Sequence, residues 1–583
     1  GITRYGPYGN QTDINMRGFD SERIAFLVNG IPVNSPVSGD FDIFMVDLNA
    51  VDRIEVIYGG SDSKYNVTGA LGGIINIITV KEEERGLRIG GSFSNTAALP
   101  GKYHKPGAGP QGPKWQDLAD SQNLTLSLGL GTEKGSWSAG FFANRAGNHF
   151  LFEDYYGRTL RREANEVWDT GTSLSLVRNL SAGVKIIAGG DLYYGDKNIP
   201  LSGISAAAEE QRDFSTRENL MLEIPGLMGD DFSVEASLSH AWQSRKYGAS
   251  SRHDFHTISA INRWAWYSRD WLTLRLGGDY RYSYLDSTDM GLHGRHDGGL
   301  YLTGELQAPG RLLIIPSLKA VFNGTNAAPL TPVPKFGLLW NPGPSLSIKN
   351  NYFRSFKLPD FEDLYWAGGG MYGSPDLKPE DGWGLDLGAA WKPKNIDLEG
   401  TFFAQWTADS IHWYPSGGTW KPQNVGEAVF FGLDLRTRFE IPLGRLSGGA
   451  LERIGLSLSY QPLLSYLLSY GYGYSSNKRI PYMPLHSAAL SIDFPWKAGG
   501  ASPSPRPGSL AISGHYQGFR YSDTANIGRL RPYFLLNANL NQEINQNLSV
   551  FLVLRNILNR SYESFNDYYM PGLSASLGLR VKF

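Results

Sequence analysis

Two groups of histidines are the residues whose type and spacing most readily suggest chemistry. The groups are His253, Asp254 and His256, followed by His293, His296 and Asp297. Imidazole and carboxylate groups bind Zn²⁺ and Cu²⁺, or a chelate of such a metal. The groups fall in long loops that flank one predicted hairpin, so we expect them to be neighbours. They form a candidate metal site, and solvated polar loops are the alternative interpretation.

An acidic connection over residues 196–215 is a second candidate cation site. Its carboxylates belong to Asp196, Glu209, Glu210 and Asp213. Ca²⁺ prefers oxygen ligands of this kind, but the spacing is irregular, so solvated charge is the alternative interpretation. We predict that no cofactor is required, and we keep Ca²⁺ or a transition metal in the long loops as an open alternative.

No arrangement of residues for catalysis is found in the sequence. Gly368, Gly370 and Gly373 match the spacing of a dinucleotide-binding loop, but Ser374-Pro375 follows where a helix should begin. The chain contains no His-Glu-x-x-His motif and no Walker A loop. Cysteine is absent, which excludes disulfides and thiolate metal sites. We therefore predict that the protein is not an enzyme.

Length and composition limit the kinds of fold that could position these residues. A chain of 583 residues exceeds one soluble hydrophobic core, which stops growing near about 250–300 residues. The chain therefore forms several domains or one very large closed sheet. Its net charge of −2 gives no global field that would attract nucleic acid. The 31 tyrosines, 15 tryptophans and 70 glycines favour strands with aromatic girdles and tight turns.

The last segment of the chain shows the period of a strand most clearly. In residues 573–583, Leu577 and Leu579 occupy odd positions, and Ser574 and Ser576 occupy even ones. Alternation with a period of two puts the two sets on opposite faces of one strand. Strands in soluble proteins average about 5–6 residues, so repeated longer segments favour a membrane barrel over a sandwich.

The same rhythm recurs in twenty-two segments, an even number, as expected for a bacterial outer-membrane barrel. The predicted strands are residues 86–96, 122–132, 136–146, 168–177, 183–195, 216–224, 232–244, 257–267, 271–283, 299–307, 311–322, 333–340, 345–355, 382–392, 396–408, 425–439, 454–464, 485–495, 508–519, 532–541, 547–558 and 573–583.

The connections between these segments tend to alternate between short and long. Short turns fall at 133–135, 269–270, 341–344 and 393–395, and long ones at 97–121, 147–167, 196–215, 356–381, 409–424 and 465–484. Outer-membrane barrels have short periplasmic turns and long extracellular loops. The pattern predicts an all-β fold, a twenty-two-stranded antiparallel transmembrane barrel in the bacterial outer membrane.

Residues 13–80 do not share this rhythm. They mix glycine with short apolar runs at 24–28, 54–58 and 74–80. A barrel of twenty-two strands is wide enough to need a plug in its lumen. We predict an α+β plug domain over residues 1–85 and the barrel over residues 86–583.

Motifs in both regions resemble those of TonB-dependent outer-membrane receptors. In the plug region they are Met16-Arg17-Gly18-Phe19, Leu27-Val28-Asn29-Gly30, Val51-Asp52-Arg53-Ile54-Glu55-Val56 and the run 69–79 with Gly72 and Gly73. In the barrel region they are the segments 353–359, 374–380 and 554–562 and the terminal Phe583. The resemblance spans nearly the whole chain, and the length is similar to that of the family's cobalamin receptors.

The resemblance implies a function and a set of partners. It implies an outer-membrane receptor that binds a scarce nutrient outside, either a corrinoid or a ferric siderophore or other metal chelate. Import would follow from rearrangement of the plug by the TonB–ExbB–ExbD complex, which binds a segment that is missing before residue 1. The resemblance further implies contact with outer-membrane lipid, recognition of Phe583 by the barrel assembly machinery, and no nucleic-acid partner.

The resemblance also implies where the nutrient binds, namely at the plug apices over residues 5–11 and 34–40 and in the loops above them. The candidates are Tyr5, Tyr8, Asn10, Asn34, Ser35 and Ser38 at the apices, and Tyr365, Trp366, Tyr372, Trp413, Tyr414 and Trp420 in loops 356–381 and 409–424. Aromatic side chains with a polar edge suit a bulky ligand. Ordinary loop chemistry and an outer aromatic girdle are the alternatives.

The sequence departs from the family pattern at one turn of the plug. The family usually has Arg-Gly-Pro after the Glu-Val motif, and its arginine commonly pairs with barrel carboxylates. Here the chain reads Gly59-Gly60-Ser61. The resemblance therefore leaves the latch between plug and barrel without its usual arginine.

Two other functions fit a plugged barrel. One is a passive porin with a static plug, and the other is a surface adhesin or partner-binding receptor on the same scaffold. Uptake that survives uncoupling of the proton gradient would reject the energised importer. A soluble β enzyme would have to stay dispersed without detergent.

Overall fold

The computed structural model describes most of the chain. The described residues are 2–4, 6–10, 12–48, 50–59, 65, 67, 69–79, 85–99, 114–154, 156–200, 208–227, 229–324, 330–416, 418–443, 451, 453–470, 477–498 and 506–583.

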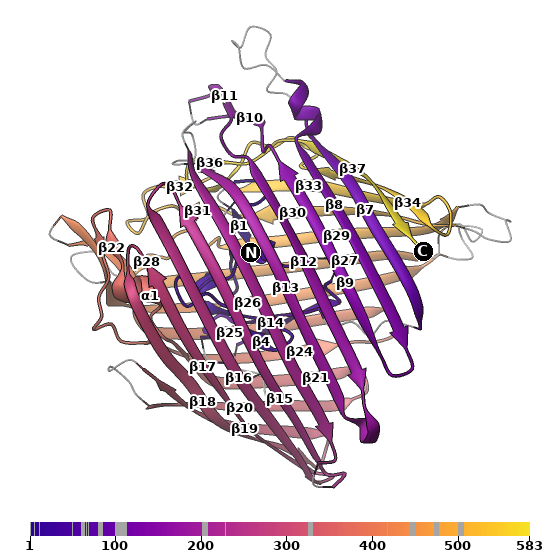
Figure 1. Cartoon of the computed structure of the whole chain (residues 1–583), viewed down its shortest axis with the longest axis vertical. Helices are drawn as coiled ribbons and strands as arrows, with labels where there is room; N and C mark the ends of the chain where they lie inside the picture. The colour runs from indigo at the N-terminus through magenta and orange to yellow at the C-terminus, as the bar shows by residue number, and fades with distance from the viewer. Residues whose placement is uncertain are drawn as a thin grey trace.

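Twenty-two long strands of the described chain form one closed barrel (Figure 1). They are β7 (Gly86–Ala98), β8 (Ser121–Thr132), β9 (Gly135–Ala146), β12 (Val167–Asn179), β13 (Lys185–Pro200), β14 (Ala208–Pro225), β15 (Phe232–Tyr247), β16 (Ser251–Arg269), β17 (Leu272–Ser287), β18 (Gly291–Ala308), β19 (Leu312–Asn323), β20 (Leu330–Gly343), β21 (Leu346–Lys357), β24 (Glu380–Trp391), β25 (Ile396–Ser416), β26 (Thr419–Pro442), β27 (Arg453–Tyr470), β29 (His486–Ala498), β30 (Arg506–Gln517), β33 (Tyr533–Glu543), β34 (Leu548–Arg555) and β37 (Ser574–Lys582).

Each long strand pairs antiparallel with its neighbour in sequence, and the last strand closes the ring on the first. In this closing pair, Leu579 of β37 lies opposite Phe93 of β7. Every predicted strand corresponds to one of these strands, so the predicted barrel is confirmed. Several strands run well beyond their predicted ends, most clearly β16, β18, β25 and β26.

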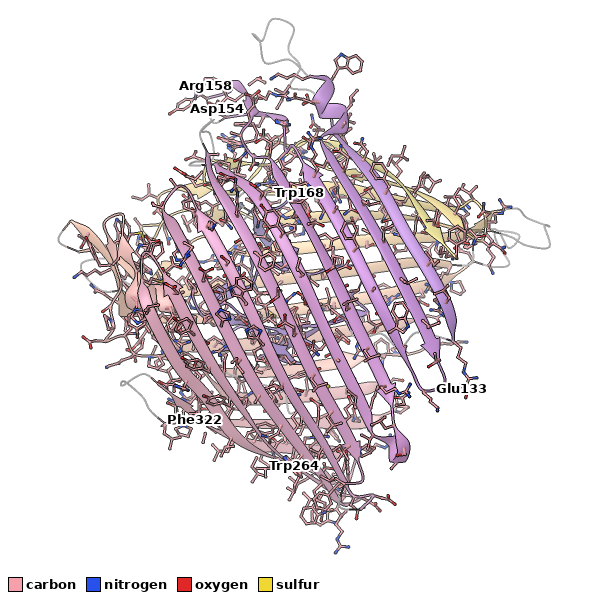
Figure 2. The ribbon with its side chains drawn as sticks, in the orientation of Figure 1. Glu133, Asp154, Arg158, Trp168, Trp264 and Phe322 are labelled. Carbon is pink, nitrogen blue, oxygen red and sulfur yellow. The ribbon has the colours of Figure 1, made fainter. Side chains whose placement is uncertain are left out.

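The alternation of side chains separates an outer apolar face from a polar lumen. On β8, Leu124 and Leu126 are exposed on the outer face, whereas Thr125 between them is buried. Figure 2 marks Trp168, Trp264 and Phe322, three exposed side chains that belong to the same outer surface. A closed barrel satisfies the backbone groups of every strand inside lipid. None of the helices in the described part of the chain is long and apolar enough to span a membrane.

The connections lie at two opposite ends of the barrel. Figure 2 shows Asp154 and Arg158 of one long connection at one end and Glu133 of a short turn at the other. The long connections carry further short elements: β10 (Phe150–Glu153), β11 (Thr159–Arg162), α1 (Phe361–Tyr365), β22 (Ala367–Gly368), β23 (Met371–Tyr372), β28 (Lys478–Arg479), β31 (Arg520–Tyr521), β32 (Arg529–Leu530), β35 (Glu563–Phe565) and β36 (Tyr568–Tyr569).

A small sheet of the N-terminal region lies inside the barrel, where Figure 1 shows it in indigo. Its strand order is β4 (Ile31–Pro32), β3 (Ile24–Val28), β6 (Gly73–Ile78) and β5 (Arg53–Tyr58), with β3 and β6 parallel. Strands β1 (Ile2–Arg4) and β2 (Thr12–Ile14) form a separate antiparallel pair.

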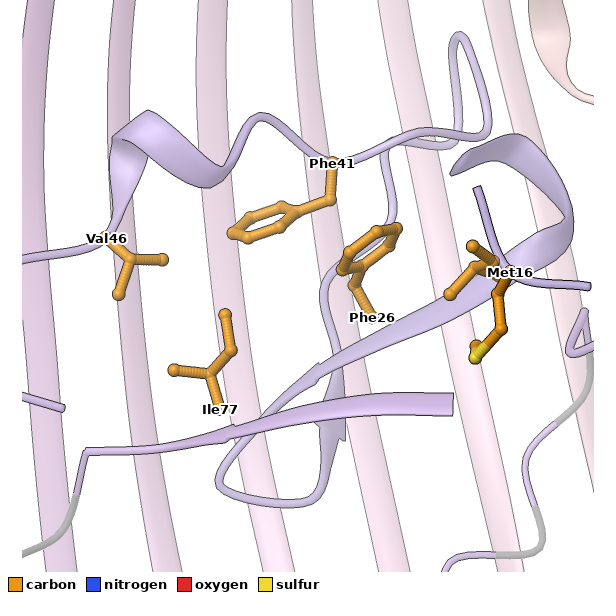
Figure 3. Close-up of a cluster of buried hydrophobic side chains, with 6 residues drawn as sticks. Met16, Phe26, Phe41, Val46 and Ile77 are labelled. Atoms are coloured by element: carbon orange, nitrogen blue, oxygen red, sulfur yellow. The ribbon is translucent and has the colours of Figure 1, made fainter. Parts of the chain in front are cut away.

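The core of this plug packs on the small sheet (Figure 3). Ile24 and Phe26 from β3 are fully buried against Met16, Phe41 and Ile77. Burying an aliphatic or aromatic side chain of this size stabilises the fold by about 1.5–3 kcal/mol. Short apolar runs in the sequence therefore form a core of their own, separate from the barrel wall.

Candidate functional site

An arginine of the plug lies between two carboxylates of the barrel wall. Arg17 donates from Nη1 to Asp386 of β24 at 2.7 Å and from Nε to Asp434 of β26 at 2.8 Å. The side chains of Arg17 and Asp386 are only 2% and 3% exposed. The guanidinium carbon also lies 4.5 Å from the centre of the Phe403 ring. Removing one partner of a buried ion pair costs about 3–5 kcal/mol. We call this contact between plug and wall the Arg17 latch.

Tyr58 and Gly59 complete the Arg17 latch. The Arg17 guanidinium lies 4.6 Å from the centre of the Tyr58 ring, and Arg436 of β26 lies 5.2 Å from it. Arg436 also donates to the Tyr58 hydroxyl. Gly59 is close to the wall, since a Cβ there would lie 2.6 Å from Asp386 Oδ2. The latch therefore has a cation, Arg17, although the arginine of the family pattern is absent.

Further charged contacts fix the plug to separate parts of the wall. Arg23 donates to Glu380 of β24 from both Nε and Nη2, at 2.9 and 2.5 Å. Glu380 is fully buried and also accepts from the Ile411 N–H at 2.8 Å. On another strand, Lys197 of β13 donates to Asp42 of the plug at 2.9 Å.

The remaining plug-motif residues shape the plug. Arg53 and Glu55 form an exposed ion pair on β5 at 2.9 Å. Gly18 has φ +94° and approaches the wall so closely that a Cβ would lie 2.5 Å from the Phe430 ring. The N–H of Gly72 donates to the Arg23 carbonyl at 2.8 Å, and Gly73 begins β6.

The first predicted apex contacts the wall between β9 and β12. The Tyr8 hydroxyl donates to Asp169 at 3.2 Å, and the Tyr8 carbonyl accepts from Asn148 at 2.8 Å. Burial, together with the Asp169 carboxylate, raises the pKa of Tyr8, so its hydroxyl is a donor at neutral pH. Asn10 is 2% exposed, and Tyr5 lies outside the described residues. Ligand contact at this apex stays a prediction.

The polar side chains of the second apex bond within the plug. Asn34 Oδ1 accepts from the Phe26 N–H at 2.7 Å. Ser35 Oγ accepts from two N–H groups of the same turn at 3.1 and 3.4 Å, and Ser38 Oγ donates to Asp40 at 2.6 Å. These groups hold the shape of the apex, and their contact with a ligand stays a prediction.

The short helix α1 covers the second apex. The N–H groups of Phe361 and Glu362 donate to the carbonyls of Pro36 and Val37, both at 2.9 Å. Phe361 is 1% exposed and belongs to the same apolar cluster as Val37. Burial, with the neighbouring carboxylates, raises the pKa of Glu362 to about 7. The connection between β21 and β24 is therefore docked on the plug.

Two predicted aromatic residues pack beside this apex. Tyr365 at the end of α1 stacks on His293, with ring centres 3.5 Å apart. The Trp366 ring centre lies 5.9 Å from that of His253. Tyr365 and Trp366 both pack against the apolar cluster that includes Val37. Sequence reasoning placed these aromatics and histidines in separate candidate sites, and the structure joins them.

Trp413, Tyr414 and Trp420 lie on a β-hairpin, so their predicted placement in a loop is wrong. The pairing of β25 with β26 continues beyond the predicted strand ends at 408 and 425. Trp413 Nε1 donates to Asp363 of α1 at 3.1 Å, and Tyr414 is buried. Trp420 and Tyr372 are half exposed, at 49% and 46%.

The four candidate histidines lie in strands β16 and β18, which corrects their predicted placement in loops. Residues three apart on a strand face opposite sides, so His253 and His293 face the lumen whereas His256 and His296 face outward. His256 lies 3.2 Å from His240 on the outer face. Among the described residues, no group of three or more His, Asp or Glu side chains is placed to hold a metal ion. The four histidines therefore do not converge on one site.

Comparison with known proteins identifies the family. The family model described as "TonB dependent receptor-like, beta-barrel" matches residues 109–557, and that described as "TonB-dependent Receptor Plug Domain" matches residues 1–74. The chain belongs to the TonB-dependent receptor family. The receptor is therefore a protein of the bacterial outer membrane, as its motifs and its barrel predicted.

Individual relatives of the receptor are distant. The vitamin B12 transporter BtuB of Photobacterium profundum is 24% identical over 605 residues, which cover 99% of this chain and 87% of the relative. The siderophore receptor PirA from Pseudomonas aeruginosa matches with a TM-score of 0.72 at 17% identity, over 98% of this chain and 93% of that one. The FrpB iron transporter from Neisseria meningitidis matches with a TM-score of 0.78 at 12% identity, over 100% and 95%. These structural matches establish the fold alone.

The acidic residues predicted as a calcium site are paired with cations. Asp196 lies 3.2 Å from Arg212, which also pairs with Glu210. Asp213 is buried and accepts from Arg245 at 2.8 Å. These residues lie in β13 and β14, so most of the predicted loop 196–215 is strand. Bound Ca²⁺ in this part of the receptor stays a prediction.

Sequence reasoning missed the partners in the Arg17 latch. Arg17 was recognised as a motif residue, but Asp386 and Asp434 lie 369 and 417 positions away. One signal was present in the sequence. Both aspartates occupy lumen-facing positions of predicted strands, where a carboxylate indicates a contact inside the barrel.

Proposed function

We propose that this receptor binds a scarce nutrient at its extracellular mouth and imports it by TonB-coupled rearrangement of the plug. The observation that carries the proposal is the Arg17 latch, a buried ion pair between the plug and a closed barrel. A closed barrel has no free edge through which a ligand could leave sideways. The ligand passes only when the plug moves, and movement of the plug separates Arg17 from both carboxylates.

The proposed cargo is a corrinoid or a metal chelate such as a ferric siderophore. Relatives of the chain include a vitamin B12 transporter, and similar folds include a siderophore receptor and a copper transporter. The half-exposed Tyr372 and Trp420 support binding of a bulky ligand at the mouth.

The proposed partners follow from the membrane setting. TonB, with ExbB and ExbD, supplies the work that moves the plug, and outer-membrane lipid surrounds the apolar wall. Phe583 is 71% exposed, and its N–H donates to the Ile89 carbonyl at 2.8 Å. An exposed terminal aromatic on a fixed strand supports recognition by the barrel assembly machinery. The family consists of receptors and transporters, and we propose no catalytic role.

Uptake by whole cells tests the proposal. Cells that lack other receptors would be given radiolabelled cyanocobalamin or a radiolabelled ferric chelate, with and without a protonophore. The proposal predicts that the protonophore abolishes uptake and leaves surface binding intact. Uptake that continues unchanged would instead indicate a passive plugged barrel. Binding without uptake under every condition would indicate an adhesin-type receptor.

A further inference from the structure

The lumen face of β26 carries three features in order from its extracellular end toward its periplasmic end. Phe430 lies against Phe19 of the plug, with ring centres 4.4 Å apart. Asp434 accepts from Arg17 of the latch at 2.8 Å. Arg436, two positions further along the strand, lines a cavity of about 460 Å³. One strand therefore carries an apolar plug contact, then the Arg17 latch, and then the cavity.

Two rows of paired residues form much of the wall of this cavity. Each row crosses β25, β26, β27, β29 and β30, and its members lie opposite one another in neighbouring strands. The first row is Asp397, Arg438, Ser457, Ser491 and Ser513. The second row lies two positions away, and in it Ser459 of β27 is opposite Ala489 of β29. The wall is therefore charged on β25 and β26 and has small side chains on β27 and β29.

These small side chains leave room for the cavity. Where the plug packs on the wall, the lumen-facing side chains are larger. Phe142 and Tyr193 pack against Met45 of the plug, and the centre of the Phe403 ring lies 4.5 Å from the Arg17 guanidinium carbon. Serine and alanine are shorter and leave the space that aromatic rings fill elsewhere. The resulting volume lies within the range of about 300–1,000 Å³ that is typical of small-molecule sites.

The charged groups at the edge of the cavity are paired with one another. Lys392, in the turn before β25, pairs with Asp397 at 3.0 Å and with Glu399 at 2.6 Å. Arg438 pairs with Glu440 at 3.6 Å. The serine hydroxyls beyond them can both donate and accept hydrogen bonds. This wall therefore suits a solute with a polar surface, whatever the sign of its charge.

We propose that release of the Arg17 latch opens this cavity toward the extracellular mouth, and that the imported ligand passes along β26 and β27 and over the serines of β27, β29 and β30. The inference rests on the proposed import function and assigns its route. It also assigns the class of solute that the route fits, namely a molecule with a polar, hydrogen-bonding surface.

The order of the features on β26 supports this route. The Phe19–Phe430 contact and the Arg17 latch both lie between the extracellular mouth and the cavity. A plug that withdraws from β26 breaks both contacts together. Arg436 then also loses the Tyr58 hydroxyl, to which it donates at the edge of the cavity. Movement away from this one strand is therefore enough to join the mouth to the cavity.

Ion conductance of the purified full chain in planar lipid bilayers tests the route. The chain contains no cysteine, so a single introduced cysteine can be modified alone. Arg17→Met opens the latch, and Ser459→Cys adds a thiol to the wall of the cavity. We expect this double variant to conduct ions. A methanethiosulfonate reagent with a bulky aryl group should block most of the current, and a reductant should restore it.

A second cysteine and a matched control keep the test sharp. Ser491→Cys in the same Arg17→Met background places the thiol in the other row and should give the same block. Ser175 of β12 lies two positions after Ser173, which donates to the plug, so it also faces the lumen. Ser175 is not among the residues that line the cavity. Modification of Ser175→Cys in that background should leave the current unchanged.

Three results would overturn the proposal. A current that the reagent leaves unchanged in both cavity variants would show that ions do not pass over the serines. An equal block at Ser175→Cys would show that the cavity is not the specific route. Absence of current in Arg17→Met would show that release of the latch does not open the cavity.

The assay separates this proposal from the import function, because the bilayer contains neither TonB nor a nutrient. A block at the cavity cysteines together with gradient-independent uptake by cells would keep the route and reject the importer. Gradient-dependent uptake together with a current that the cavity cysteines do not control would keep the importer and reject the route.

Discussion

The guanidinium of Arg17 meets the carboxylate of Asp386 at 2.7 Å, and the two side chains are 2% and 3% exposed. One residue comes from the plug and the other from the middle of the barrel sequence. Their contact fixes the plug in the lumen at a place from which water is largely excluded. Removing either partner alone is costly, because the remaining charge would be buried without compensation.

Removing the positive charge of Arg17 should therefore weaken the docking of the plug in the barrel. Arg17→Met leaves Asp386 and Asp434 buried without their cation, and we expect the plug to lose about 3–5 kcal/mol of docking free energy. Hydrogen exchange of the plug amides should become faster, and the barrel should leak ions in planar bilayers. The triple variant with Asp386→Asn and Asp434→Asn should recover part of the loss.

The control for this prediction is an exposed ion pair of the same plug. Arg53 is 57% exposed and pairs with Glu55, so Arg53→Gln should change plug docking by no more than about 1 kcal/mol. Exchange rates of Arg17→Met that match those of Arg53→Gln would contradict the importance of the latch.

Tyr58 gives a second prediction. Its ring lies 4.6 Å from the Arg17 guanidinium and 5.2 Å from that of Arg436. Tyr58→Phe keeps both cation–π contacts and should cost about 1 kcal/mol for the lost hydrogen bond. Tyr58→Arg places a third cation beside two others and should loosen the plug more. If Tyr58→Arg proved as stable as wild type in chemical denaturation, this account of the latch would be wrong.

The docking of α1 on the plug should depend on pH. Glu362 has a pKa of about 7 when docked, above its ordinary value of 4.5, because docking buries it. The docked state therefore binds the proton more tightly. Docking should strengthen as the pH falls from above 7 toward 4.5, by up to about 3 kcal/mol, and weaken as the pH rises through 7.

Protection of the Phe361 and Glu362 amides measures this effect, because both donate to the plug apex. Their hydrogen exchange, corrected for the intrinsic rate at each pH, should be slower at pH 5 than at pH 8. Glu362→Gln should show strong protection at both values. Equal corrected protection of the wild type at both pH values would refute the prediction.

Two neighbouring residues of β8 test the orientation of the wall. Leu126 is 51% exposed on the outer face, and Ser127 faces the lumen. Leu126→Arg should cost about 2–4 kcal/mol in lipid, whereas Ser127→Arg should cost much less. Urea titrations of folding into lipid vesicles would compare the two variants. A larger loss for Ser127→Arg would reverse the assigned faces.

Much of the barrel could be predicted from the sequence because its strands obey a local rule. The alternation in residues 573–583 needs no distant partner, and the corresponding strand is β37 (Ser574–Lys582). The predicted strand ends were less accurate on the extracellular side of the barrel. The register of the β25–β26 pair shifts between Thr407 and Ile411, so the regular alternation is broken before the hydrogen-bonded hairpin ends.

The contacts of the plug could not be predicted in the same way. Arg17 and Asp386 are 369 positions apart, and no local pattern connects them. Asn34 was assigned to ligand contact because apex loops are polar. Its side chain bonds the backbone of Phe26 in β3 and of Gly39 in its own loop, and its contact with a ligand stays a prediction. The four histidines were predicted in loops for a related reason. A polar strand end has the composition of a loop, and only its pairing partner shows that it is a strand.

A reversible crosslink between plug and wall tests the central claim most directly. The Ser173 hydroxyl of β12 donates to the Asp47 carboxylate of the plug at 3.1 Å. Cysteines at both positions can therefore be joined by a thiol-cleavable crosslinker. The account predicts that crosslinked cells still bind the ligand but take none up, and that a reductant restores uptake. Uptake by crosslinked cells at the rate of reduced cells would show that the plug need not move, and would contradict the account.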